Sequence, residues 1–172
     1  MVASDGENRY NILNGRGSNV DAGNLLPIAA SLKRNDQYRP AEKGRAMIGI
    51  DEYRQIVSEL LDEFPKAFFR ELSGGVIVSE AVVIPAYARE NDLYTMGVYK
   101  TFSGVRQIVL YKGSFDRAYP AADAAEAKRL LRGILRHEFR HHLEFLGGVH
   151  DASSLEAADE REKQAYLARH RT

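Results

Sequence analysis

The sequence predicts an α+β domain, in which a small three-stranded sheet packs on an amphipathic helix and on a second, longer helix. Three observations lead to this prediction. Apolar residues recur at the three- and four-residue spacing of a helix after Asp51. β-branched and aromatic residues then dominate three short segments, at 76–84, 94–102 and 105–111. The helical spacing returns over about residues 121–146.

The first helix is expected to begin at Asp51, a suitable N-cap, and to end at Pro65, which cannot continue a helix. Its apolar positions are Tyr53, Ile56, Val57, Leu60, Leu61 and Phe64. Apolar residues at 68–72 predict a further short turn of helix, which the sequence Ser-Gly-Gly at 73–75 ends.

The second and third strands should form a hairpin, because only Ser103 and Gly104 separate them. The polar segments at 85–92 and 112–120 are expected to be connecting loops.

Glycines at 147–148 end the long helix, and Ser153 with Glu156 three residues later forms a capping box. The capping box predicts a last helix that reaches about residue 170.

The 172 residues have the length of one globular domain. Residues 1–46 are rich in Asn, Gly, Ser and charged side chains, and we expect a flexible extension there, with residues 25–32 as its apolar cluster. The folded domain is expected over residues 47–172.

The 24 basic and 24 acidic side chains balance, so no overall field favours a nucleic acid or an anionic membrane as partner. No apolar run approaches the roughly 18 residues of a membrane helix, and the start lacks the order of a secretory signal. These features predict a cytoplasmic protein. Cysteine is absent, so a metal would be bound by His, Asp or Glu.

Residues 137–141 read His-Glu-Phe-Arg-His, the pattern HExxH. On a helix, His137 and His141 lie on one face about one turn apart, as two ligands of one Zn²⁺ ion require. Glu138 flanks the pair, where it can take a proton from water without binding the metal. The histidines continue the row of Leu130 and Ile134, which favours an inward position over the alternative, a charged and solvent-exposed helix face.

His142 lies about 100° around the helix from His141. It is therefore expected at the surface or as a neighbour that supports the site, rather than as a ligand.

The segment HEFRHHLEFLGGVHD at 137–151 resembles that of the minimal zincins, a family of small bacterial metallopeptidases. IVLYKGSFDRAY at 108–119 and EYRQIVSELLDEFPKAF at 52–68 extend the resemblance over about residues 47–167. It implies a zincin-like fold, a bound Zn²⁺ ion and hydrolysis of peptide bonds with Glu138 as general base.

The family pattern HExxHxxGxxD also implies that an Asp after the helix is the third zinc ligand. Here Glu144 stands at the Gly position and Gly147 at the Asp position, so the helix is about one turn longer. Residues 148–151 restore the order G-x-x-D, which makes Asp151 the third ligand by resemblance.

Four other side chains remain alternatives for the third ligand. His150 fits the order G-x-x-H that metzincins use, and Glu144 lies on the same helix face as His137. Glu156 and Asp159 on the last helix would imitate the distant Glu of thermolysin-like enzymes.

The resulting functional prediction is a zinc metallopeptidase that acts on a peptide or protein, paired with an edge strand at 94–102 or 105–111. A catalytically weak zinc-binding module that binds peptides or regulates a partner is the alternative, and hydrolysis of other amides is a third. Of the tyrosines near these strands, one could assist the oxyanion, although packing is the favoured role; they are Tyr99, Tyr111 and Tyr119.

Overall fold

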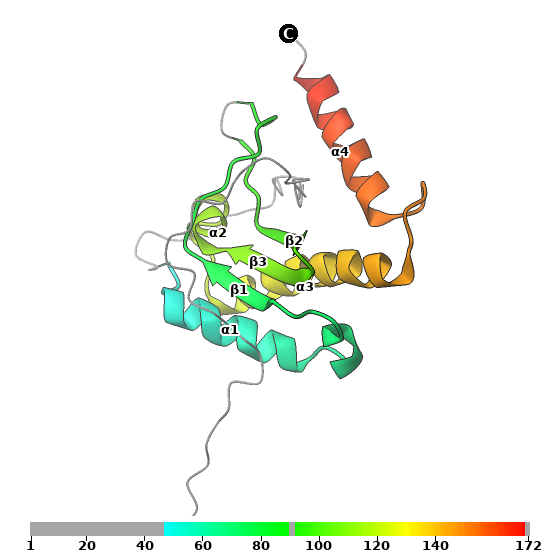
Figure 1. Cartoon of the computed structure of the whole chain (residues 1–172). Helices are drawn as coiled ribbons and strands as arrows, with labels where there is room; N and C mark the ends of the chain where they lie inside the picture. The colour runs from blue at the N-terminus through cyan, green and yellow to red at the C-terminus, as the bar shows by residue number, and fades with distance from the viewer. Residues whose placement is uncertain (1–46, 90–91, 171–172) are drawn as a thin grey trace, which may run out of the picture.

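The computed structural model describes residues 47–89 and 92–170, and confirms the α+β class (Figure 1). In chain order the elements are α1 (Ile50–Asp62), the 3-10 helix η2 (Lys66–Phe69), β1 (Gly75–Ser79), β2 (Gly97–Phe102), β3 (Val105–Tyr111), α2 (Lys112–Ala118), α3 (Ala124–Gly147) and α4 (Leu155–Arg169). The extension predicted at 1–46 lies outside the described residues. Within those residues, no helix has both the length and the apolar character that crossing a membrane requires.

The sheet has the strand order β1-β3-β2, with β1 parallel and β2 antiparallel to the central β3. The predicted hairpin of β2 and β3 is confirmed. Its turn residues Ser103 and Gly104 have φ angles of 45° and 79°, the left-handed values that suit a tight two-residue turn. β2 is therefore an edge strand of this sheet.

One face of the sheet packs on α1 and α3, which lie together on that side (Figure 1). Alternation along the strands turns Val76, Val78, Ile108 and Leu110 toward these helices. Each fully buried aliphatic side chain of this kind stabilises the fold by about 1.5–3 kcal/mol. The helices contribute most of the remaining core, including Tyr53, Val57, Leu60, Leu61, Leu131, Leu135 and Phe139.

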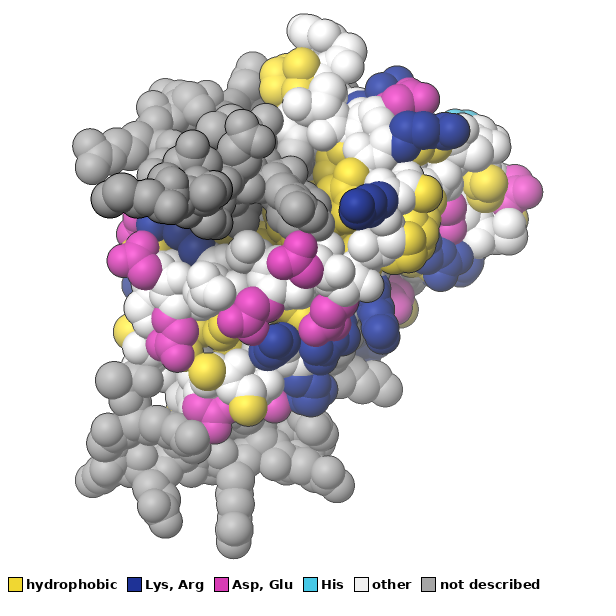
Figure 2. All heavy atoms as spheres, turned by 90° about the horizontal axis from the view of Figure 1, so that it is seen from below, with side chains coloured by type: hydrophobic (Ala, Val, Ile, Leu, Met, Phe, Trp, Pro, Cys, Tyr) yellow, Lys and Arg dark blue, Asp and Glu magenta, His cyan; other side chains and the backbone are white. Residues whose placement is uncertain are grey.

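Ion pairs join α1 to α3 on the outer side of this helical layer. Lys128 contacts Glu59 at 2.7 Å, and Arg132 contacts Glu63 through two hydrogen bonds of 2.9 Å. Figure 2 shows acidic and basic side chains interspersed over this face of the molecule. Because water screens such pairs, they favour the mutual register of the helices more than the stability of the fold.

Several predicted boundaries shift in the structure. α1 begins at Ile50 with Gly49 as N-cap, and Asp51 lies in its first turn, where a negative charge is favourable. β1 stops at Ser79, short of the predicted residue 84. β3 ends at Tyr111, the partner of Ser79, and the backbone of Val83 bonds instead to the Ser114 hydroxyl and to the Thr95 amide.

The prediction of a loop at 112–120 is wrong, because α2 occupies most of it. α2 contains a glycine and a single large apolar side chain, so it has no helical period to detect. Phe115 is 1% exposed and packs edge-on against Tyr53 at a centroid distance of 5.5 Å. This tertiary contact stabilises a helix that the local sequence does not predict.

α3 matches the predicted long helix, and Gly148 ends it with a left-handed φ of 66°. Ser154 rather than Ser153 caps α4, and its hydroxyl accepts a hydrogen bond from the Ala157 amide. Ser153 lies one residue before the N-cap, where its amide and hydroxyl both donate to Oδ1 of Asp151.

Two glycine-to-alanine substitutions should have opposite effects. At Gly113 a Cβ would collide with the carbonyl oxygens of Glu80 and Ala81, both of them backbone atoms, so Gly113→Ala should destabilise the fold by about 1–3 kcal/mol. Gly133 is exposed on α3 with no atom within 4 Å of such a Cβ, so Gly133→Ala should stabilise by up to about 1 kcal/mol. Urea unfolding measures both changes. Equal effects at the two positions would contradict the packing of α2 against residues 80–81.

Candidate metal centre

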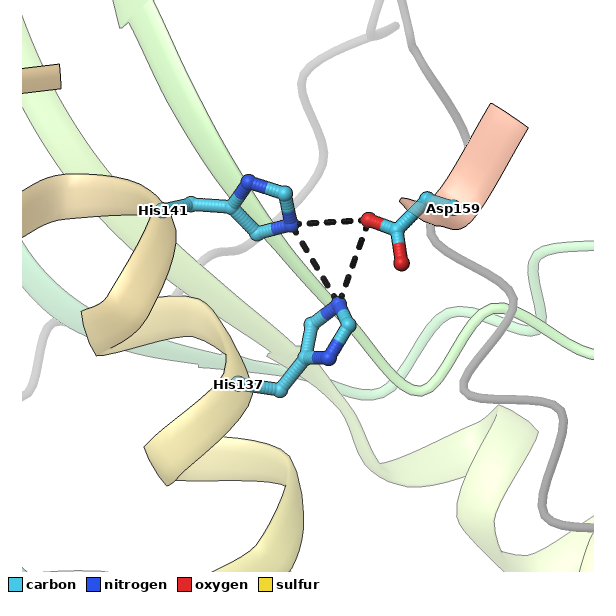
Figure 3. Close-up of side chains that lie close together, drawn as sticks. All are labelled: His137, His141 and Asp159. Carbon is cyan, nitrogen blue, oxygen red and sulfur yellow. Dashed lines mark hydrogen bonds and ion pairs between the residues drawn. The ribbon is translucent and has the colours of Figure 1, made fainter. Parts of the chain in front are cut away.

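His137 and His141 lie one turn apart on α3, with ring centroids 4.9 Å apart. Their Nε2 atoms approach to 3.3 Å. The side chains are 22% and 12% exposed, so the prediction that they turn inward, away from a solvated helix face, is confirmed. The rings face α4 across a short gap (Figure 3).

Asp159 of α4 completes a group of three side chains (Figure 3). Its Oδ2 lies 2.9 Å from Nε2 of His141 and 3.4 Å from Nε2 of His137. The loop at 148–154 reverses the chain after α3, so that Asp159, little more than one turn into α4, faces the histidines. Two imidazole nitrogens and one carboxylate oxygen thus lie close together.

The separations among these three atoms fit a tetrahedral metal ion. With metal–ligand bonds of about 2.0–2.1 Å, neighbouring ligands of tetrahedral zinc lie about 3.3–3.4 Å apart. The observed distances of 3.3, 2.9 and 3.4 Å are close to this value. The three side chains could therefore hold a metal ion with only a small movement of Asp159.

The charges of the group also suit a cation. Burial alone would raise the pKa of Asp159, but hydrogen bonds from the two histidines outweigh it and lower the pKa, so the carboxylate is ionised. Burial alone would lower the pKa of His137, whereas Asp159 and Glu138 together raise it. A bound cation would take the place of the proton that His137 gains from this arrangement.

Glu138 points from α3 toward β2 and is 1% exposed. Its carboxylate is close to the backbone N–H of Tyr99, and its Oε2 has no hydrogen-bond partner among the described residues. Burial raises the pKa of this carboxyl to about 8. A buried acid with an unbonded oxygen, beside side chains that could hold a metal ion, is typical of a catalytic site.

Gly97 makes room for this carboxylate. A Cβ at Gly97 would lie 2.9 Å from Oε1 of Glu138 and 2.9 Å from Cγ2 of Ile134. No motif in the sequence points to Gly97, although a glycine inside a predicted strand often marks such a close approach.

The structure does not bring Asp151, the third ligand implied by the family resemblance, to the histidines. Asp151 is exposed in the loop between α3 and α4, where its Oδ1 accepts hydrogen bonds from the amide and hydroxyl of Ser153. The extra turn of α3 carries the loop past the histidines, and α4 then folds back. The geometry favours Asp159, one of the four alternatives.

The remaining alternatives are engaged elsewhere or exposed. Glu144 binds Arg140 at 2.7 Å and the Leu155 amide at 2.6 Å. His150 is exposed beside the ring of Phe145, and Glu156 is exposed in the first turn of α4.

His142 supports the site from inside the fold rather than from the surface, since it is fully buried. Its Nε2 lies 2.9 Å from the Arg70 carbonyl, to which it must donate, and its Nδ1 accepts from the Tyr99 hydroxyl at 3.2 Å. Burial lowers the pKa of His142, which keeps the ring neutral as this pattern requires. These bonds fix α3 against β2 and against the end of η2, one residue after His141.

The other two tyrosines considered for the oxyanion pack instead. Tyr111 is 4% exposed in a cluster with Val98 and Val109, and Tyr119 packs against Phe115. This agrees with the packing role that the sequence favours for these two tyrosines.

Comparison with known proteins assigns no activity to this arrangement. No family model matches the chain, and no curated protein matches it either. A solved structure of a conserved hypothetical protein from Thermus thermophilus is 27% identical, and the match covers 59% of this chain and 100% of that one, with a TM-score of 0.49. A TM-score at this level is not evidence of a shared fold or a shared function.

The metal-free protein should lose stability as the pH rises from about 5 to about 8. The folded-state pKa of Glu138, about 8, lies above its ordinary value of 4.5, so the folded protein binds the extra proton in this range. The contribution is full below pH 4.5 and is lost toward pH 8, with a slope of at most about 1.4 kcal/mol per pH unit. Urea unfolding of metal-free protein at several pH values measures it.

Glu138→Gln should flatten this pH dependence, whereas Glu156→Gln, at an exposed glutamate, should leave it unchanged. An identical slope in the wild type and in Glu138→Gln would refute the protonation of Glu138.

Two aspartate variants separate the candidate third ligands. Asp159→Asn should weaken zinc binding by more than the roughly 10–100-fold that a change outside the ligand shell costs, because a charged ligand is lost. Asp151→Asn should leave zinc affinity near that of the wild type. Competition with a chromophoric chelator measures both. The reverse result would return the third position to Asp151.

Proposed function

We propose that this protein is a zinc metallopeptidase, with His137, His141 and Asp159 as zinc ligands and Glu138 as general base. The observation that carries the proposal is the convergence of three ligand atoms at near-tetrahedral separations beside a buried glutamate with an unbonded oxygen. The resemblance of residues 137–151 to the minimal zincins supports the roles of His137, His141 and Glu138, while Asp159 is assigned from the geometry alone.

Zinc suits this group better than other metals. Two imidazole nitrogens and one carboxylate oxygen in tetrahedral array are a ligand set that catalytic zinc uses, with a fourth position left open. Zinc so bound supplies a Lewis acid and lowers the pKa of water from about 15.7 toward about 7.

Glu138 moves the proton. Its pKa is raised to about 8 by burial, and a cation held by the neighbouring His137 would lower that pKa and favour the ionised carboxylate. The unbonded Oε2 then receives the proton from the attacking water and passes it to the leaving amine. Proton transfer of this kind contributes about 10²–10⁴-fold in rate.

The substrate class follows from β2 being an edge strand. The Tyr111 amide donates to the Met96 carbonyl, and antiparallel alternation then directs the backbone groups of Gly97, Tyr99 and Thr101 outward. The Tyr99 amide already lies against Glu138, so an extended peptide would pair with the outward groups beyond it, at Thr101. The proposed substrate is therefore a peptide or protein segment in extended conformation.

A weakly active zinc-binding module of the same fold is the second candidate. The observation that favours it is the burial of Glu138, which is 1% exposed and close to the Tyr99 amide. A base held in this way would need β2 to shift before it could reach water. Such a module would bind a peptide on β2 without cleaving it.

Peptide cleavage by Glu138→Gln tests the proposal. With a mixed library of fluorogenic peptides, zinc-loaded wild type should cleave some members, and Glu138→Gln should lose at least about 100-fold in rate because the base is absent. Glu156→Gln serves as the matched control and should retain activity. Both variants should still bind zinc.

Cleavage by Glu138→Gln at the wild-type rate would rule out this mechanism. Tight zinc binding by a wild type that cleaves no peptide in the library would favour the module.

A further inference from the structure

α4 is held to the rest of the protein by few side chains. Most of its surface is polar or charged, and only Leu155 and Tyr166 are buried. Figure 1 shows the helix running away from the end of α3 and from the sheet. An isolated helix of about 12–15 residues is marginal in water, so α4 depends on specific contacts for its position.

These contacts lie on one face of α4. Leu155 at its start donates its amide to Oε2 of Glu144 at 2.6 Å. Asp159, four residues on, meets the two histidines, and Tyr166, seven residues further, lies on the same face. The metal ligand is thus between two points of attachment.

Tyr166 attaches the far end of α4 to the segment between β1 and β2. Its hydroxyl donates to Oδ1 of Asp92 at 2.6 Å and accepts from the Arg89 amide at 2.7 Å. The ring packs edge-on against Tyr87 with centroids 5.9 Å apart. Tyr166 is 8% exposed, so its own side of these bonds is buried, although Arg89 and Asp92 are exposed.

We propose that Tyr166 is a positioning residue for the metal ligand Asp159, and that metal binding and the docking of α4 strengthen each other. Two helical turns, about 10 Å, separate the two side chains, and a helix transmits position rigidly over that length. If Tyr166 holds α4 in place, Asp159 is already oriented and less free energy is lost when the metal binds. By linkage, the metal must then stabilise the docked helix to the same extent.

The inference rests on the metal site of the proposed function and does not require peptidase activity. Asp159 lies 18 residues beyond His141, on a helix that other contacts must hold in place. Any protein or ligand that displaced α4 would therefore also weaken metal binding.

Zinc affinity of Tyr166→Phe tests the proposal. This variant keeps the ring against Tyr87 and removes only the hydroxyl, so zinc should bind about tenfold more weakly, within the usual range of coupling between sites. Asp92→Asn, which changes the partner instead, should weaken zinc in the same direction. Tyr119→Phe is the matched control, since Tyr119 packs on Phe115 ahead of α3, and should bind zinc as the wild type does.

Two further readouts separate positioning from a general loss of structure. The absorption spectrum of the Co²⁺-loaded protein should be the same in saturated wild type and Tyr166→Phe, because the ligands are unchanged, and should differ in Asp159→Asn. Added zinc should slow amide exchange along α4 in the wild type, and less so in Tyr166→Phe.

Unchanged zinc affinity in both Tyr166→Phe and Asp92→Asn would overturn the inference. So would rates of amide exchange in α4 of the wild type that are the same with and without zinc. If those variants weaken zinc although the wild type cleaves no peptide, the inference stands and the peptidase proposal fails. If peptide is cleaved and zinc affinity does not depend on Tyr166, only the inference fails.

Discussion

α3 packs on the core with one face and carries the two histidines on the adjoining face, and the rest of the structure depends on this arrangement. Its apolar row, with Leu131, Leu135 and Phe139, is buried against α1 and the sheet. The adjoining face carries His137 and His141 toward α4. Because both sets belong to one rigid helix, the packing that fixes the core also fixes the direction in which the imidazoles point.

Two polar side chains, His142 and Glu138, are buried between α3 and β2. They differ in how well hydrogen bonds compensate for the loss of water. His142 is buried, but both of its ring nitrogens are hydrogen-bonded, so its desolvation is compensated and it fastens the helix to the strand. Glu138 is buried with one oxygen unbonded, so its desolvation is compensated less well. The unfavourable burial of Glu138 beside three side chains that could hold a metal ion is consistent with its proposed role in proton transfer.

The third candidate ligand, Asp159, belongs to a part of the molecule with a different physical character. The first two come from a helix anchored by the core, whereas Asp159 comes from a helix with two buried side chains. Its position depends on polar contacts at both ends, with Glu144 and with the segment that contains Asp92. The candidate site thus joins a rigid half to a half that is held by a few directional bonds.

The sequence alone determined what depends on near neighbours in the chain. The periods of α1 and α3, the hairpin with its Ser103 and Gly104 turn, and the paired histidines with Glu138 are all encoded within a few residues. The candidate third ligand, α2 and the contact of Gly97 with Glu138 were decided by the tertiary structure. Phe115 makes a helix of α2 only by packing on Tyr53, and Asp159 rather than Asp151 reaches the histidines only because the loop carries α4 back. Contacts of this kind depend on the path of the chain through space, which no local spacing of residues records.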